Sequence, residues 1–297
     1  MAVRLHTSDG VAISVAEAGA EDAATTVVLL HGWTGDHTLW DGVLARIGGR
    51  ARVLAPDFRG HGSSGPAPRG SATIDRLADD VAELVAARAP RGPLVLVGHS
   101  LGGMVMMALA ERHPELVGRR VRGAMFVATS SGGLREVTFG LPAPLAALLA
   151  RRRGKAAPRP VRPASAPRPA KPAIGALPVR NQLLATRLIR WVAFGRRPAA
   201  ADVRATVAQV ARAHRGSSAG FRRALGSHER KAALAAYRSV PTVVLAGERD
   251  RLTPLEHARV IAAELPSAAF VSYPRSGHML PYEQVDDLAA RLRTLIG

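Results

Sequence analysis

The chain contains no cysteine among its 297 residues, which excludes disulfides, a thiol nucleophile and metal binding through thiolates. It also lacks any run approaching the roughly 18 uninterrupted apolar residues that a membrane-spanning helix needs. Residues 1–7 do not form the continuous apolar region of a secretion signal. We therefore expect a cytoplasmic protein, and peripheral contact with a membrane stays open.

Acidic residues are scarce in the middle of the chain. Residues 131–239 carry 22 basic and three acidic side chains, whereas the rest of the chain carries 19 basic and 20 acidic ones. The formal net charge of +18 therefore comes from the middle region. Its proline- and arginine-rich stretch at about 151–172 predicts an extended loop, because proline disfavours helix and sheet and like charges repel.

Aromatic residues make up only 4% of the chain, and none is interleaved with this basic stretch. A surface that binds nucleic acid usually combines such aromatics with a recognition fold, so nucleic acid is not the favoured partner. Three explanations of the charge stay open. They are a compositional bias, since 38 of the 41 basic residues are arginine, attraction to anionic lipid headgroups, and attraction of acidic substrates such as acyl-carrier or coenzyme A esters.

The length and the hydrophobic fraction of 47% fit a core of about 200 residues with an inserted smaller unit. Short apolar runs alternate with helix-like runs, which predicts an α/β fold with a mostly parallel central sheet flanked by helices. The predicted core comprises residues 1–130 and 240–297, and a mainly helical, basic cap comprises residues 131–239. Expected strands lie at 26–31, 52–56, 94–98, 123–129, 242–247 and 269–273, with an edge hairpin at 3–6 and 11–17 and helices near 40–46, 74–87, 102–112, 255–264 and 282–295.

The most informative motif is G-H-S-L-G at residues 98–102, which lies between a strand-like run and a helix-like run. Glycines on both sides of Ser100 allow a sharp turn that no Cβ obstructs. A serine at the tip of such a turn can expose its hydroxyl above the N-terminus of the following helix. The motif therefore predicts that Ser100 is a nucleophile.

A nucleophilic serine needs a base and an acid that orients the base, and both candidates follow apolar runs further along the chain. Asp250 comes after the run at 242–246, and His278 comes after the run at 269–273. The carboxyl ends of parallel strands share one edge of a sheet, so we expect Ser100, Asp250 and His278 to meet there.

Together these motifs resemble the α/β-hydrolase fold family, in particular its serine esterase and lipase-like members. The resemblance extends to V-V-L-L-H-G-W at 27–33 and D-F-R-G-H-G-S-S at 57–64. It implies that Asp250, rather than its neighbour Glu248, is the acid of the triad. It also implies that the backbone N–H groups of Trp33 and Leu101 form the oxyanion hole.

In the same resemblance, the turn at 57–64 is structural and Arg59 helps to shape it. His31, His61 and His99 are interpreted as hydrogen-bonded scaffold residues, since no spacing among them resembles a metal site. No metal and no organic cofactor are expected.

The function that follows is hydrolysis of a carboxylic ester with a hydrophobic acyl or alcohol part, through an acyl-enzyme on Ser100. Epoxide hydrolases and dehalogenases of this fold use an aspartate in that position, so the serine favours acyl chemistry. Other reactions of the same triad, C–C bond hydrolysis or a perhydrolase-like activity, are the alternative. A non-enzymatic protein that binds polyanions or membranes through the basic cap is a more distant one, and the complete triad argues against it.

Two apolar stretches of the middle region are expected to serve the acyl pocket. Residues 137–150 are too few to span a bilayer and are expected to cover the pocket. A helical stretch at 183–194 carries Leu184, Leu188, Trp191 and Val192 at helical spacings. We expect these side chains to be packed, over the mouth of the pocket.

Overall fold

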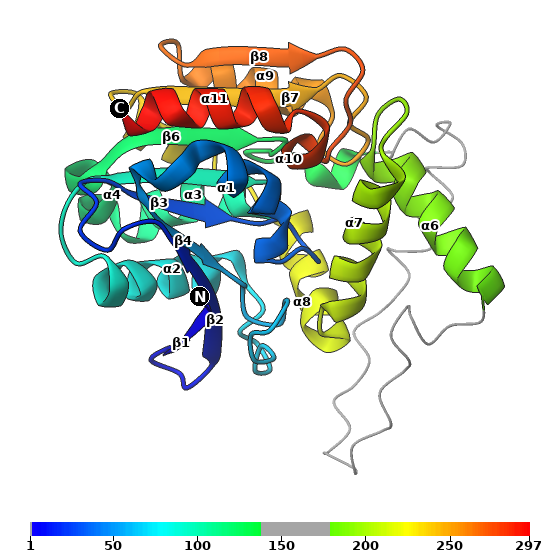
Figure 1. Cartoon of the computed structure of the whole chain (residues 1–297), viewed down its shortest axis with the longest axis horizontal. Coiled ribbons are helices and arrows are strands. Elements are labelled where there is room, and N and C mark those ends of the chain that lie inside the picture. The colour runs from blue at the N-terminus through cyan, green and yellow to red at the C-terminus, as the bar shows by residue number, and fades with distance from the viewer. Residues whose placement is uncertain (1, 138–178) are drawn as a thin grey trace.

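Strands of one eight-stranded sheet run through the centre of the computed structural model, which describes residues 2–137 and 179–297 (Figure 1). Their order is β1-β2-β4-β3-β5-β6-β7-β8. β2 pairs antiparallel with both β1 and β4, and the pairings from β4 onward to β8 are parallel. The strands are β1 (Ala2–His6), β2 (Ala12–Ala18), β3 (Thr26–Leu30), β4 (Arg52–Pro56), β5 (Leu94–His99), β6 (Val121–Val127), β7 (Thr242–Gly247) and β8 (Ala269–Tyr273).

The central strands are buried along their whole length, because helices cover both faces of the sheet (Figure 1). Their sequences are continuous runs of valine and leucine, as expected for parallel strands without a solvent-facing side. Leu96 of β5 belongs to one apolar core and Val97 to the other, so the alternation of side chains along one strand builds both. The fold is therefore the α/β architecture that the sequence predicts.

Helices α2 and α3 pack on one face of the sheet, and α1 and α11 pack on the other. None of the helices within residues 2–137 and 179–297 is long and apolar enough to cross a membrane. The helices are α1 (Asp41–Ile47), α2 (Ile74–Arg88), α3 (Leu101–Arg112), α4 (Pro114–Arg120), α6 (Val179–Ala193), α7 (Ala200–Arg212), α8 (Arg215–Gly226), α9 (Leu255–Glu264), α10 (Leu280–Glu283) and α11 (Val285–Ile296), with 3-10 turns η1 (His37–Trp40), η2 (Gly48–Arg50), η3 (Leu134–Glu136) and η5 (Lys231–Tyr237).

The turn at 57–64 is held by buried charges. Arg59 is fully buried and donates to Asp80 at 2.6 Å and to Asp9 at 2.7 Å. The Asp57 carboxylate accepts the Ser63 N–H at 2.8 Å, and a Cβ on Gly62 would lie only 2.2 Å from Asp57 Oδ2. The turn therefore has the structural role expected for it, since its glycine makes room for a carboxylate that fixes its backbone.

Besides boundary shifts of one or two residues, the α-helices and β-strands of the core differ from the prediction in two respects. The single helix expected at 282–295 is two helices, α10 and α11, because Gln284 leaves helical geometry with φ −136° and ψ 37°. Helix α4 is absent from the prediction although Pro114 stands in its first turn, a favoured position for proline. Its seven residues include Gly118, which weakens the helical pattern in the sequence.

Helices α6, α7 and α8 connect β6 to β7 in the region predicted to be the cap, and Figure 1 shows them beside the sheet rather than within its layers. Arg212 of α7 forms an ion pair with the buried Asp36 at 2.6 Å, and Gln209 donates to Thr38 at 3.0 Å. These contacts join the region to the loop that follows β3. The stretches at 138–150 and 151–172 lie outside the described residues, and the domain limits at 131 and 239 stay predictions.

The packing expected for the apolar side chains of α6 is wrong for three of them. Leu184, Leu188 and Trp191 are 55%, 60% and 41% exposed. Instead, Ile189 and Val192 pack against the core. The helix carries apolar residues on two sides, so periodicity alone could not tell which side turns inward.

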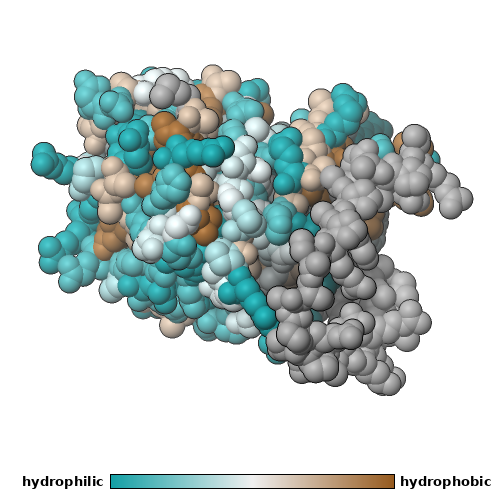
Figure 2. Space-filling model, turned by 90° about the horizontal axis from the view of Figure 1, so that it is seen from below, coloured by the Kyte–Doolittle hydropathy of each residue, from teal (hydrophilic) through white to brown (hydrophobic). Residues whose placement is uncertain are grey.

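The coloured part of the face shown in Figure 2 is mostly hydrophilic, and its hydrophobic patches are small and separated.

Candidate active site

Ser100 stands between β5 and α3, at the carboxyl edge of the sheet. Its φ of 52° and ψ of −116° lie where a residue with a side chain is strained. Flanking glycines permit the turn, because a Cβ on Gly98 would lie 2.5 Å from the carbonyl carbon of Gly102 and one on Gly102 would lie 2.1 Å from the Leu30 oxygen. The motif forms the predicted strand-to-helix turn and leaves Ser100 partly exposed.

Hydrogen bonds to the end of β6 brace this turn. The Ser100 N–H donates to the Val127 oxygen at 2.9 Å, and the Thr129 hydroxyl donates to the Ser100 oxygen at 2.6 Å. A Cβ on Gly103 would lie 2.6 Å from the Thr129 side chain, so α3 begins in close contact with this strand end. The strained backbone is thus fixed by its surroundings rather than by the turn alone.

Asp250 and His278, which are 28 residues apart in the sequence, form a buried pair. His278 Nδ1 lies 2.7 Å from Asp250 Oδ2. When Nδ1 carries the proton and donates to this carboxylate, Nε2 is the unprotonated nitrogen and can act as a base. The His278 ring packs against the ring of His99, the residue before Ser100, with 4.8 Å between centroids. The structure therefore brings the pair beside the turn that carries Ser100.

The Asp250 carboxylate is held in place by the loop that follows it. Its Oδ1 accepts the N–H groups of Leu252 at 2.8 Å and Thr253 at 2.9 Å. The Thr253 hydroxyl lies 2.8 Å from Asp250 Oδ2 and 2.9 Å from the Ala128 oxygen. Sequence reasoning missed Thr253, although an aspartate followed by a threonine three residues later is a typical turn pattern.

Glu248, the competing acid, lies apart from this pair. Its side chain is exposed and accepts a hydrogen bond from the Ser272 hydroxyl at 2.8 Å. Its backbone N–H donates to the Tyr273 oxygen at the end of β8. The geometry therefore favours Asp250 as the partner of His278.

Glu283 is a second residue that sequence reasoning missed. Its carboxylate accepts the N–H of Gly195, two residues after the end of α6, at 2.8 Å and the N–H of Gly277, directly before His278, at 3.0 Å. Burial raises the pKa of Glu283. The His278 N–H donates to the Ala193 oxygen at 2.8 Å. The loop that carries His278 is thus joined to the end of α6, a contact between distant segments that no local sequence pattern signals.

The H-G-W segment after β3 packs against the Ser100 turn. A Cβ on Gly32 would lie 2.8 Å from His99 Nδ1 and 3.2 Å from the Ser100 Cβ. Trp33 follows directly, and its indole N–H donates to the Ser218 oxygen of α8 at 3.1 Å. Leu101 is the first residue of α3, where a backbone N–H has no partner inside the helix. These two residues therefore flank the nucleophile turn, where an oxyanion hole is expected.

The other histidines of the motifs bond to the backbone, as expected of scaffold residues. His31 Nε2 accepts the Phe58 N–H at 2.9 Å, and His61 Nδ1 lies 3.0 Å from the Arg59 oxygen. His99 Nε2 lies 2.9 Å from the His278 oxygen. Burial lowers the pKa of His61 to about 3 and holds that of His99 well below its usual range. These rings are therefore neutral at physiological pH.

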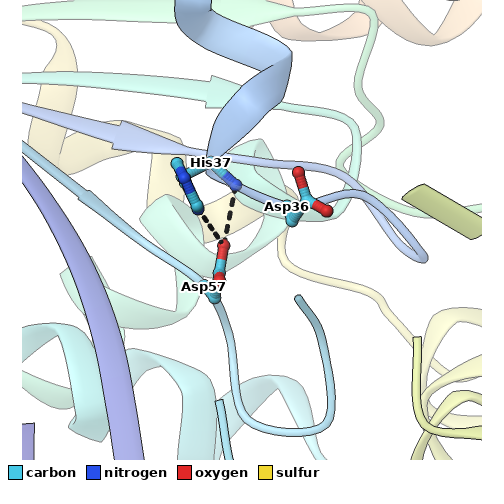
Figure 3. A group of neighbouring side chains, drawn as sticks. All are labelled: Asp36, His37 and Asp57. Carbon is cyan, nitrogen blue, oxygen red and sulfur yellow. Dashed lines mark hydrogen bonds and ion pairs between the residues drawn. The ribbon is translucent and has the colours of Figure 1, made fainter. Parts of the chain in front are cut away.

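Asp36, His37 and Asp57 form a cluster whose ligand atoms lie within 4.8 Å of one another (Figure 3). Asp57 Oδ1 already accepts both the backbone N–H and the ring nitrogen of His37, each at 2.8 Å. Asp36 accepts from Thr38 and pairs with Arg212. These hydrogen bonds account for the cluster as a structural network, which joins β4, η1 and α7.

Comparison with known proteins finds a matching family and a similar curated protein. Residues 27–291 match the family described as the alpha/beta hydrolase family. A curated relative, a pimeloyl-[acyl-carrier protein] methyl ester esterase from Chromobacterium violaceum, is 31% identical over 279 residues, which cover 90% of this chain and 94% of the relative.

Two solved structures superpose on almost the full length of this chain. A hydrolase from Pseudomonas aeruginosa PA01 superposes with a TM-score of 0.72 at 25% identity and covers 100% of this chain and 98% of its own. An esterase from Rhodococcus sp. ECU1013 gives a TM-score of 0.76 at 21% identity, covering 99% of this chain and 98% of its own. At that identity, the second likeness concerns the fold alone.

Proposed function

Because the chain belongs to the alpha/beta hydrolase family and is a hydrolase, we propose that it cleaves carboxylic esters through an acyl-enzyme on Ser100. The observation that carries the proposal is the buried contact of 2.7 Å between His278 Nδ1 and Asp250 Oδ2, beside the strained turn of Ser100. This contact orients the imidazole of His278, and the turn presents the hydroxyl of Ser100. The proposal therefore takes His278 as the base and Ser100 as the nucleophile.

In the proposed reaction, His278 Nε2 takes the proton of the Ser100 hydroxyl as the oxygen attacks the ester carbonyl. The oxyanion that forms accepts hydrogen bonds from the N–H groups of Trp33 and Leu101. The imidazolium, stabilised by Asp250, then protonates the leaving alcohol. Water, deprotonated by the same imidazole, attacks the acyl-enzyme, and the acid leaves with Ser100 restored.

The proposed substrate has a hydrophobic acyl or alcohol part. The relative from Chromobacterium violaceum is named for a methyl ester on an acyl-carrier protein, which supports an ester whose remainder is acidic. The 22 basic side chains of residues 131–239 would attract such a substrate, whether it carries an acyl carrier, coenzyme A or another anion. The predicted cap, which provides these charges, would then contribute to substrate choice.

A panel of substrates tests the proposal. Chromogenic esters of increasing acyl length are compared with a dienoic diketone, which reports C–C bond hydrolysis, and with a perhydrolysis assay. We expect turnover of esters that falls to background in the Ser100→Ala variant. Turnover of the diketone alone would assign the triad to C–C bond hydrolysis instead, and no turnover of any substrate by a folded protein would favour a non-enzymatic role.

A further inference from the structure

Helix α6 turns an apolar face outward. Leu183, Leu184 and Leu188 are 58%, 55% and 60% exposed, and Trp191 is 41% exposed. On the opposite side Ile189 and Val192 pack against the core. Three leucines more than half exposed on one helix are unusual for a protein surface in water, where large apolar side chains are mostly scattered singly.

Positive charge surrounds these side chains. Arg187 and Arg190 are exposed on the same helix, and α6 contains no acidic residue. Arg196 and Arg197 follow in the loop after it, also exposed. Within the described part of the chain, none of these four arginines forms an ion pair with a carboxylate. The face therefore combines leucine side chains with positive charge that is not neutralised locally.

The tryptophan of this face is held in a fixed position. The Arg251 guanidinium stacks over the Trp191 ring at 4.9 Å and donates to the Trp191 oxygen at 2.7 Å. An indole with a cation on its face and apolar neighbours is typical of the boundary between lipid headgroups and acyl chains. Figure 1 shows α6 at the outer edge of the molecule, beside α7 and away from the sheet.

We propose that the outward face of α6, namely Leu183, Leu184, Arg187, Leu188, Arg190 and Trp191, docks onto an anionic lipid surface. The leucines enter the boundary of the acyl chains, and the arginines contact the headgroup phosphates. Charge complementarity selects this occupant. A dissolved polyanion would satisfy the arginines and leave the leucines in water, and a neutral apolar partner would leave the arginines without counter-charges.

The C-terminal end of the docking helix lies next to the candidate active site. The Ala193 oxygen, at the end of α6, accepts the N–H groups of His278 at 2.8 Å and Met279 at 3.1 Å. Binding to lipid does not depend on the proposed ester hydrolysis, whereas delivery of a hydrophobic ester from the membrane would rest on it. The two proposals can therefore fail separately.

Flotation with vesicles tests the docking. The full chain is mixed with vesicles of phosphatidylcholine alone or of phosphatidylcholine and phosphatidylglycerol at about 3:1. We expect binding to the anionic vesicles only, weakened by salt because exposed charges are screened. Leu184→Ser with Leu188→Ser should weaken this binding at least about tenfold, since both side chains lose their apolar contact. Arg187→Gln with Arg190→Gln should weaken it several-fold.

Matched controls separate this face from other exposed groups. Val260→Ser removes an apolar side chain that is 43% exposed on α9, and Arg204→Gln removes an exposed cation on α7. Neither should change flotation. Because all four altered α6 side chains are exposed, the variants should melt like the parent chain. Trp191 fluorescence should shift to the blue on binding, and the shift should vanish in Trp191→Phe.

Three results would overturn the docking. They are absence of flotation at low salt, equal binding to neutral and anionic vesicles, and a leucine variant that binds like the parent chain while the arginine variant does not. The last result would show a polyanion surface without lipid insertion. The Ser100→Ala variant should float like the parent chain, because Ser100 lies between β5 and α3 and the α6 face is unchanged.

Discussion

The core and the middle region differ in how they use charge. The core contains 19 basic and 20 acidic side chains, and Arg59 is buried between Asp9 and Asp80. The middle region contains 22 basic and three acidic side chains. Arg212 and Arg230 pair with carboxylates of the core, whereas arginines such as Arg187 remain exposed. Paired charges stabilise a fixed geometry, whereas unpaired ones attract anions over distance. Our proposals accordingly assign chemistry to the core and recognition to the middle region.

The two regions meet at the loop of the candidate base. Glu283 and the Ala193 oxygen hold the end of α6 against the residues around His278. Changes on either side of this contact should therefore have different consequences, and the following predictions are ordered by the size of the effect that we expect.

Ser100→Ala should have the largest effect, because it removes the attacking oxygen from the core while leaving the middle region unchanged. We expect kcat/KM for a short ester to fall at least about a thousandfold, with the melting temperature close to that of the parent chain. Steady-state kinetics and a thermal melt measure both. Activity near that of the parent chain in a pure, folded variant would remove Ser100 from the mechanism.

Asp250→Asn should lower kcat by about a hundredfold or more with little change in KM, since the amide no longer fixes the tautomer of His278. Glu248→Gln is the matched control, because Glu248 is exposed and contacts Ser272 instead. We expect that control to stay within about twofold of the parent chain. If the two variants ranked the other way, the assignment of the acid would be wrong.

Glu283→Ala should lower kcat by about tenfold, because the N–H groups of Gly195 and Gly277 lose their acceptor and His278 loses part of its support. Glu283→Gln keeps one accepting oxygen and should retain more of the activity. Ser100 itself is unchanged in both variants, so labelling by a phosphonate should slow without disappearing. Equal activity of both variants and the parent chain would show that the contact between the regions has no bearing on His278.

We expect acidic pH to lower the free energy of unfolding, with contributions from buried histidines in both regions. Burial lowers the pKa of His61, in the core, to about 3 and that of His228, in the middle region, to about 4. In the unfolded chain, histidine titrates near the usual value of about 6.5. The unfolded chain therefore binds more protons as the pH falls below that value, and the free energy of unfolding decreases.

Urea unfolding at pH 7.5 and pH 5 measures this loss. His228→Gln, which can still donate to the Ser130 oxygen, should reduce the difference between the two pH values. The exposed His6→Gln should leave it unchanged. A parent chain equally stable at both values would contradict the burial of neutral histidines.

The smallest effect on catalysis is expected from the basic stretch of the middle region. Replacing Arg151, Arg152, Arg153 and Lys155 by serine should weaken association with acidic esters at low salt, and added salt should mimic the variant. Hydrolysis of a short neutral ester should hardly change. If neither acidic esters nor anionic vesicles distinguish the variant from the parent chain, the charge of this stretch reflects composition alone.

The fold and the candidate triad could be predicted because their signals are local. Buried parallel strands are continuous apolar runs, and the turn of Ser100 needs glycine at fixed positions. Asp250 and His278 each follow such a run, so the shared edge of the sheet predicts their meeting without knowledge of any contact.

What could not be predicted depends on contacts between distant segments. Glu283 binds two N–H groups 88 and six residues away, which no pattern around it signals. The orientation of α6 is similar, because leucines on one side and Ile189 with Val192 on the other give the helix two apolar faces. Which face of α6 turns inward is decided by its packing against the rest of the fold, which the helical pattern does not show.

Labelling with a serine-directed phosphonate is the most direct test of the central claim, namely that Ser100 is the nucleophile and depends on Asp250. After reaction with a fluorophosphonate, peptide mass spectrometry locates the adduct in the parent chain and in the Ser100→Ala and Asp250→Asn variants. We predict one adduct, on Ser100, formed much more slowly in Asp250→Asn and absent from Ser100→Ala. An adduct on Ser130 or Ser63, or labelling that persists without Ser100, would contradict the account.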